Sequence, residues 1–258
     1  MKNSRWLIVL AGCLFALAIG CAKKEEPAAA GEAVPTAAAP AFDRAIGTAS
    51  VSGKVSFQGT PPAPPQIKMN ADAACVAMHK EPVYAEDIVV TNGMLENVFV
   101  YVKEGLEKYT FAVPADPVVI RQEGCRYVPH VSGAMVNQKI KLVNNDPTPH
   151  NIHCWAEKNP QFNIGQPLKG MATEKTFTVP EVMIHFRCDV HKWMSSYLGI
   201  LPHPYFGITG REGTFLLKDL PPGEYVIEAW HEKYPAQTQK VTLGDRETKV
   251  VDFTFKAS

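Results

Sequence analysis

Alternation of apolar and polar residues dominates the chain from about residue 50 onward. In the segment 138–146, QKIKLVNND, Ile140 and Leu142 fall on one face of an extended strand while Lys139 and Lys141 fall on the other. A period of two is typical of a half-buried β-strand. The pattern therefore predicts strands, not amphipathic helices, in the middle of the chain.

The same alternation is found in the flanks of this central region. It occurs in residues 51–62, 87–105, 213–234 and 239–255. Asn92 and Gly93 suit a tight hairpin turn, and the later segments contain turns rich in proline and glycine. The composition agrees, because 21 prolines and 18 glycines suit many short strands joined by turns. We therefore predict an all-β fold.

The N-terminus predicts export. Lys2 and Arg5 precede an apolar run over 6–19, which is too short to span a bilayer and has the length of a signal-peptide core. The run ends in LAIGC, which resembles the bacterial lipobox and makes Cys21 the lipidated residue. Ala18 stands where that pattern prefers leucine. Two alternatives stay open: an earlier LAGC that ends at Cys13, and cleavage without lipid.

We therefore predict a signal peptide over 1–20 and a lipid-anchored tether over 21–47. The tether is rich in alanine, proline and charge and has no apolar period with which to build a core. The expected location is periplasmic or at the cell surface, as a membrane-anchored lipoprotein. The chain has 26 basic and 26 acidic residues, and loss of Lys2 and Arg5 with the signal leaves a small acidic excess. This balance gives no indication of nucleic-acid binding.

Four residues with metal-binding side chains occur in two clusters. His150 lies in NNDPTPHNIH, and Cys188, His191 and Met194 follow in HFRCDVHKWM with the spacing C-x2-H-x2-M. Two imidazoles, a thiolate and a weak axial thioether form the ligand set of blue-copper centres, whereas zinc prefers four strong ligands. The set predicts one type 1 copper. On an alternating strand, His153 would point away from His150.

Simpler interpretations of the same residues remain open. Cys188 could be a small buried hydrophobic residue, and Met194 could fill a gap in the core. Taken alone, Met194 would more often be a core residue than a metal ligand. Its occurrence together with Cys188 and two histidines is what favours metal binding.

These motifs resemble the cupredoxins, in particular the amicyanin and plastocyanin types, over residues 115–205. The resemblance implies a Greek-key β-sandwich in which His150, Cys188 and His191 hold copper and Met194 is the axial ligand. It also implies that Asn151 braces the ligand loop. The exposed edge of the second ligand histidine is where electrons leave such proteins, which here is His191. Trp193, Pro202, Pro204 and Tyr205 are candidates for an apolar docking surface around it.

The predicted function is electron transfer and not catalysis. Four ligands leave no open position for a substrate. The resemblance implies a redox partner such as a c-type cytochrome or another exported oxidoreductase. Two alternatives are copper storage or delivery, and a carbohydrate- or protein-binding β-sandwich with a non-redox cupredoxin domain.

The flanks resemble a second module. TGREGTFLLKDLPPGEYVIEA, residues 209–229, and SGKV, residues 52–55, resemble the carboxypeptidase-regulatory-like, transthyretin-like β-sandwich. The resemblance implies that 48–114 and 206–258 form one accessory sandwich interrupted by the cupredoxin domain, with tandem packing as the alternative. Such combinations are known as methylamine-utilisation-like proteins.

The remaining cysteines predict one disulfide. With Cys188 assigned to copper, Cys75 and Cys125 are the favoured pair, since each lies in a loop outside the metal motif. Cys154 is expected to be a buried thiol, with a role as an extra copper ligand as the alternative. A second metal site at His203 and His231 would require the fold to bring them together.

Overall fold

The computed structural model describes residues 47–257. The predicted signal peptide, the lipidated Cys21 and nearly all of the tether lie outside the described residues. Within them the chain forms nineteen strands and a single short helix, so the all-β prediction is confirmed. No helix among the described residues is both long and apolar enough to cross a membrane.

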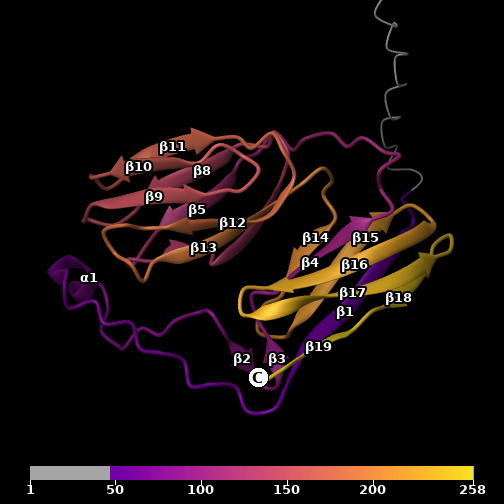
Figure 1. Ribbon diagram of the computed structural model, residues 1–258, viewed down its shortest axis with the longest axis horizontal. Coiled ribbons are helices and arrows are strands. Elements are labelled where there is room, and N and C mark those ends of the chain that lie inside the picture. The colour runs from indigo at the N-terminus through magenta and orange to yellow at the C-terminus, as the bar shows by residue number, and fades with distance from the viewer. Residues whose placement is uncertain (1–46, 258) are drawn as a thin grey trace, which may run out of the picture. The chain divides into compact units, whose positions relative to one another are not determined.

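The two flanks of the chain together form one β-sandwich, which we call the outer sandwich (Figure 1). A six-stranded sheet packs against a four-stranded sheet, and Val51 and Phe253 of the first share a core with Val100 and Ile227 of the second. Its strands are β1 (Ala49–Gln58), β2 (Val90–Thr91), β3 (Met94–Leu95), β4 (Phe99–Glu104), β14 (Phe206–Ile208), β15 (Thr214–Leu220), β16 (Gly223–His231), β17 (Tyr234–Leu243), β18 (Thr248–Val250) and β19 (Phe253–Lys256).

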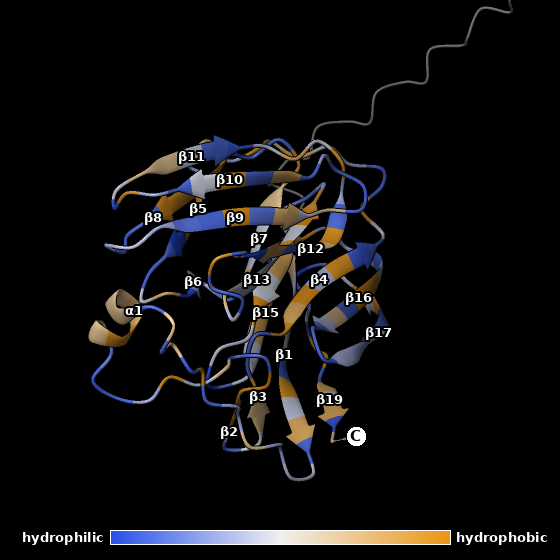
Figure 2. Ribbon diagram, turned by 60° about the vertical axis from the view of Figure 1, so that its left-hand side comes forward, coloured by the Kyte–Doolittle hydropathy of each residue, from blue (hydrophilic) through white to orange (hydrophobic). Residues whose placement is uncertain are grey.

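Strand β1 organises the six-stranded sheet. It pairs antiparallel with β15, and its two halves pair in parallel with β18 and β19 near the C-terminus. Buried and exposed residues alternate along β19 and the first five residues of β15, and Figure 2 shows the matching change between hydrophobic and hydrophilic residues along β19. The predicted period of two therefore corresponds to one face of this sheet that packs on the core and one that is exposed.

The central region forms the second β-sandwich, which we call the inserted sandwich. A five-stranded sheet has the order β10-β9-β12-β13-β7 and a four-stranded sheet has the order β11-β8-β5-β6. Its strands are β5 (Val118–Gln122), β6 (Tyr127–Val128), β7 (Val131–Met135), β8 (Ile140–Asn144), β9 (His150–Trp155), β10 (Phe162–Gln166), β11 (Ala172–Lys175), β12 (Glu181–Arg187) and β13 (Ser195–Leu201). The chain enters it after β4 and leaves it before β14, and these two strands pair with each other.

Small residues let the two sandwiches approach closely. Phe99 of β4 packs in a cluster with Val131 and Leu201 of the inserted sandwich. A Cβ on Gly199 of β13 would lie 2.6 Å from the Phe99 ring, and a Cβ on Gly133 of β7 would lie 2.5 Å from the Phe206 ring. Only glycine fits at such distances.

The segment between β1 and β2, residues 59–89, leaves the outer sandwich and packs on the inserted one. We call it the cover segment. It contains helix α1 (Ala73–Ala77), which begins at the N-cap Asp72. Met69 and Cys75 belong to the core of the inserted sandwich, and Figure 1 shows α1 away from β2 and β3. The predicted block 48–114 therefore contributes to both sandwiches.

Candidate metal centre

The loop that joins β12 to β13 carries three of the four predicted ligands. Cys188 follows the last residue of β12, and Met194 precedes the first residue of β13. The Met194 N–H donates to the His191 carbonyl at 2.8 Å, and the Cys188 N–H donates to the Met194 carbonyl at 3.4 Å. These bonds close a compact turn, so the C-x2-H-x2-M spacing brings the side chains to one end of the sandwich.

The fourth predicted ligand, His150, begins β9 at the same end. One ligand atom each of His150, Cys188 and His191 lies within 4.8 Å of the other two. The Nδ1 atoms of the two histidines are 2.9 Å apart, and Cys188 Sγ lies 4.0 Å from His191 Nδ1. Nitrogen ligands at about 2.0 Å from a shared metal lie roughly 3.2 Å apart at a tetrahedral angle. The arrangement therefore fits one metal ion among three buried donors.

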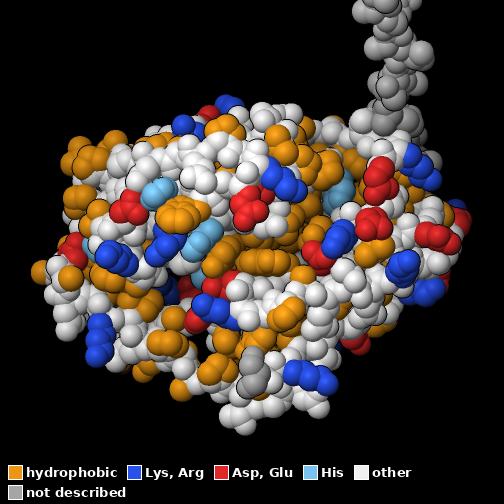
Figure 3. All heavy atoms as spheres, in the orientation of Figure 1, with side chains coloured by type: hydrophobic (Ala, Val, Ile, Leu, Met, Phe, Trp, Pro, Cys, Tyr) orange, Lys and Arg blue, Asp and Glu red, His pale blue; other side chains and the backbone are white. Residues whose placement is uncertain are grey.

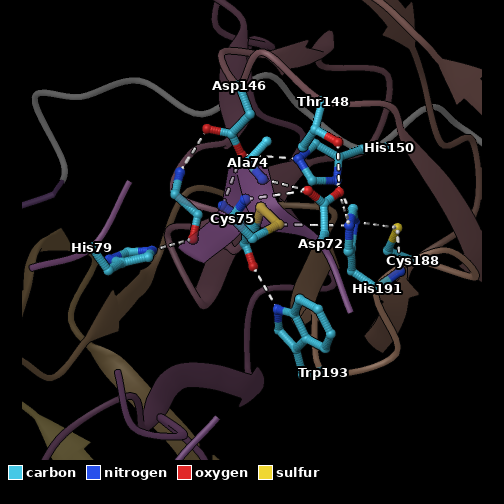
Figure 4. Close-up of a disulfide and its surroundings, with 12 residues drawn as sticks. Asp72, Ala74, Cys75, His79, Asp146, Thr148, His150, Cys188, His191 and Trp193 are labelled. Atoms are coloured by element: carbon cyan, nitrogen blue, oxygen red, sulfur yellow. Dashed lines mark hydrogen bonds and ion pairs between the residues drawn. A yellow bond between two sulfur atoms is a disulfide. The ribbon is translucent and has the colours of Figure 1, made fainter. Parts of the chain in front are cut away.

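A carboxylate lies behind each histidine (Figure 4). His150 Nε2 is 2.9 Å from Asp146 Oδ2, and His191 Nε2 is 3.0 Å from Asp72 Oδ2. A ring that donates its Nε2 proton to this carboxylate has the Nδ1 lone pair available for a metal. Carboxylates commonly orient metal-binding histidines in this way. Both rings are thus oriented with Nδ1 toward the shared point.

The environment favours a thiolate at Cys188. Burial raises the pKa of the Cys188 thiol, but hydrogen bonds from His150 and from backbone N–H groups, including those of Asn151 and His191, hold that pKa below its usual value. Burial likewise lowers the pKa of His150, but its hydrogen bonds with Asp146 and Cys188 outweigh this and hold the pKa above its usual value. The thiolate is the form that binds metal.

Asp72 is one of two residues at this site that the sequence analysis missed. Its Oδ1 accepts the N–H groups of Ala74 and Cys75 as the N-cap of α1, and its Oδ2 accepts the Thr148 hydroxyl at 2.7 Å. The bond from Thr148 lowers its pKa most, burial opposes it, and the bonds from His191 and the backbone bring the pKa to about 2. Asp72 is therefore ionised at neutral pH. An aspartate before Ala-Ala-Cys was the available signal, since aspartate is a preferred N-cap.

Asp146, also missed, is held from two sides. Its carboxylate accepts the backbone N–H groups of Gly124 and Cys125 at 2.7 and 2.8 Å in addition to His150. Burial raises the pKa of Asp146, but these hydrogen bonds hold it below its usual value. A fixed negative charge thus stands behind each imidazole.

Asn151 has the bracing position that the resemblance implies. Its Oδ1 accepts the Asp189 N–H at 2.7 Å and lies 3.2 Å from Cys188 Sγ, which ties β9 to the ligand loop. His153 lies on the face of β9 opposite His150, as expected, and its Nδ1 is 3.1 Å from Asp189 Oδ1. Met194, three residues after His191, is buried and belongs to the core of the inserted sandwich.

The structure joins Cys75 to Cys125 in a disulfide, the pair that the sequence favours. Cys75 Sγ lies 3.6 Å from His191 Nε2, so the disulfide covers the outer edge of that ring (Figure 4). Cys154 is a buried free thiol, and burial raises its pKa to about 12. Among the described residues, Cys154 belongs to none of the groups of converging metal-binding atoms.

Two expectations about the surface differ from the structure. His191 is only 2% exposed, because Asp72 and the disulfide cover the edge that was expected to be open. Pro202, Pro204 and Tyr205 lie beyond the far end of the seven-residue strand β13, about 20 Å along the strand from the ligand loop. Tyr205 belongs to the core of the outer sandwich. These three residues do not surround His191.

His203 and His231 make separate contacts. His203 Nε2 donates to the Val102 carbonyl at 2.9 Å, and His231 Nδ1 accepts the Lys233 N–H at 3.2 Å. Among the described residues, neither belongs to a group of converging metal-binding atoms. Both are side chains of the packed interior.

Comparisons with known proteins returned structural similarities alone. No protein-family profile matches the sequence, and no curated protein matches it. Among solved structures, an amicyanin variant in its Cu(I) form is 21% identical with a TM-score of 0.30, over 34% of this chain and 85% of that one. A purple cupredoxin from Nitrosopumilus maritimus is 21% identical with a TM-score of 0.28, over 32% of this chain and 98% of that one.

A copper-containing nitrite reductase from Thermus scotoductus is 16% identical with a TM-score of 0.32, over 58% of this chain and 28% of that one. Similarities at these TM-scores carry no argument about function. What the centre can do follows from its own donor atoms: a buried thiolate and two imidazoles, oriented by carboxylates, at the end of a β-sandwich.

Proposed function

We propose that the protein is a copper-binding electron carrier. His150, Cys188 and His191 would hold one type 1 copper, and Met194 would supply a weakly bound sulfur. The observation that supports this best is the convergence of one thiol and two Nδ1 atoms at a buried point. Two imidazoles and a thiolate with a thioether nearby form the ligand set of blue-copper electron-transfer sites.

The surroundings of the ligands support rapid one-electron exchange. When bound, copper supplies an ion that alternates between Cu(I) and Cu(II). The two carboxylates, Asn151 and the compact loop hold the ligands in place. A ligand set that moves little between the two oxidation states keeps the barrier to electron transfer low.

Carrier function is proposed over catalysis and over copper delivery. Three buried protein donors and an axial thioether leave no position for a substrate, which catalytic metal sites keep open. The cover segment, fixed by the Cys75–Cys125 disulfide, lies against His191 and opposes exchange of the metal. A delivery protein would need an accessible ligand set.

Location and partners belong to the same proposal. The disulfide suits an oxidising compartment, in agreement with the export signal expected from the sequence. A lipid on Cys21 would hold the carrier at a membrane surface. There it would exchange electrons with a c-type cytochrome or another exported oxidoreductase.

The test is the visible absorption spectrum of the full-length protein loaded with Cu(II). We expect an intense thiolate-to-copper band that is lost in Cys188→Ser and kept in Cys154→Ser. Cys154 is the matched control, because it is the other buried free cysteine among the described residues. A colourless wild-type protein would contradict the proposed function.

A further inference from the structure

The usual surface edge of a cupredoxin-type centre is closed in this protein. His191 Nε2 faces Asp72 at 3.0 Å and the Cys75 sulfur at 3.6 Å, both from the cover segment. An electron that leaves through His191 therefore has to cross another group before it reaches solvent. This group must be a neighbour of the His191 ring that also reaches the surface.

Trp193 is the aromatic neighbour of His191. The two ring centroids are 5.0 Å apart with an interplanar angle of 51°. The indole Nε1 donates to the Cys125 carbonyl at 2.9 Å, which fixes the ring between the ligand loop and the disulfide (Figure 4). Trp193 is partly exposed, unlike His191. It therefore connects the buried histidine with the surface.

Trp193 lines a pocket of about 290 Å³. Met194 and Ser195 line the same pocket, so it lies directly beside the ligand loop. Figure 3 shows histidine, basic and acidic side chains close together over β12 and β13, which border this pocket. A small redox molecule or a partner's side chain can thus come near Trp193 without displacing the cover segment.

Four basic side chains line the pocket against three acidic ones, which include Glu232, so positive charge is in excess by one. Arg126 pairs with Glu86 at 3.2 Å, and Lys233 pairs with Asp87 at 3.3 Å. Within the described part of the chain, Lys192 and Arg187 line the pocket without an ion pair. A negatively charged partner is therefore favoured at this surface.

We propose that Trp193 is the electron port of the centre and that it serves negatively charged redox partners. This rests on the proposed function. One electron passes from Cu(I) through the His191–Trp193 contact to the acceptor, so copper is oxidised, the acceptor is reduced, and no bond forms or breaks. Because electron tunnelling falls steeply with distance, the partly exposed indole shortens the step from partner to centre.

The main test measures oxidation of the Cu(I)-loaded full-length protein by ferricyanide in a stopped-flow instrument. Ferricyanide becomes ferrocyanide, and recovery of the thiolate-to-copper band reports the rate. We expect Trp193→Phe to lower the second-order rate constant about tenfold with an unchanged band. The control is Trp155→Phe, since Trp155 is 47% exposed on β9 of the same sandwich, and its rate should stay within twofold of wild type.

Equal rates for Trp193→Phe and wild type would overturn the port. Absence of the band in wild type would instead contradict the proposed function, so the two failures are distinguishable. Lys192→Gln tests the charge: it should slow ferricyanide about threefold and leave the cationic tris(phenanthroline)cobalt(III) unslowed. Equal slowing with both probes would overturn the preference for negative partners.

A measurement on the copper-free protein tests the port independently of electron transfer. Iodide, an anionic quencher, should reduce tryptophan fluorescence of the wild type more than that of Trp193→Phe, because it reaches the indole through the pocket. Cu(II) should then quench less fluorescence in Trp193→Phe than in Trp155→Phe. Iodide quenching that is the same with and without Trp193 would overturn the access route on which the port depends.

Discussion

The inserted and outer regions each bury a pair of histidines and use them differently. His150 and His191 in the inserted sandwich are each 2% exposed, and His203 and His231 on the outer side are 5% and 2% exposed. The first two have their Nδ1 atoms 2.9 Å apart with a carboxylate behind each ring. The other two contact backbone groups of packed strands and turns. Burial alone does not distinguish a ligand from a structural histidine; the groups opposite both ring nitrogens do.

The protonation of the rings follows the same division. Burial lowers the pKa of His203 to about 4, although the Val102 carbonyl and the charge of Glu107 oppose the shift. Burial lowers the pKa of His231 to about 4 as well. The pKa of His150 is instead raised, because the hydrogen bonds with Asp146 and Cys188 outweigh burial. The inserted sandwich therefore favours positive charge on His150, whereas burial in the outer region disfavours it on His203 and His231.

The largest expected difference between the two regions is in copper affinity when one histidine of each region is replaced. His150→Ala should lower copper affinity by more than the 10- to 100-fold typical of losing an outer partner of a ligand. His203→Ala should leave the affinity within about threefold, because its ring contacts backbone and aromatic side chains. Competition with a chelator of known affinity measures both. Similar losses in the two variants would refute the division.

The second-largest effect is expected on the stability of the fold, which acid should lower through protonation of His203 in the outer region. The unfolded chain binds a proton at His203 near pH 6.5 and the folded chain only near pH 4, so stability is present above pH 6.5 and declines as pH falls toward 4. Between pH 6.5 and 4.5 the loss is about 2 to 3 kcal/mol from this one residue. Urea unfolding of the copper-free protein at both pH values measures it.

His203→Gln is the control for the acid effect, since its amide can still donate to the Val102 carbonyl. The variant should lose about 2 to 3 kcal/mol less than wild type over the same pH range. An identical decline in both proteins would show that another group is responsible.

The smallest expected effect is on copper affinity when a carboxylate beside a ligand histidine is replaced. Asp72→Asn keeps an N-cap of similar strength for α1 but removes the charge behind His191. Copper affinity should fall 10- to 100-fold with little change in stability. Asp252→Asn is a suitable control, because Asp252 caps only the exposed Lys54 N–H in the outer sandwich. Unchanged affinity in Asp72→Asn would assign Asp72 to capping alone.

Local spacing made the ligand loop predictable. Cys188, His191 and Met194 lie within seven residues, and a short turn between strands brings them together whatever the rest of the chain does. Alternation similarly predicted the strands, because a half-buried sheet requires it. These features depend on neighbours in the sequence.

The closure of the centre was not predictable by the same means. Asp72 is 119 residues from His191, and its segment has neither alternation nor a helical period that would place it on the other sandwich. Cys75 predicted a covalent link to Cys125 but not that the link would cover His191. Contacts of this kind arise from long-range packing, so the sequence analysis wrongly expected an open edge at His191 and a docking surface of Pro202, Pro204 and Tyr205 around it.

The pairing of β1 with the end of the chain has a consequence for the order of folding. The Lys54 N–H bonds to Asp252, 198 residues further on, whereas every strand of the inserted sandwich lies between residues 118 and 201. Domains fold as units, and pairings between distant residues form slowly. A chain synthesised from its N-terminus can therefore complete the inserted sandwich first, while β1 keeps unpaired edges until β18 and β19 emerge. Among the described strands, β1 is thus the first to be synthesised and one of the last to complete its hydrogen bonding.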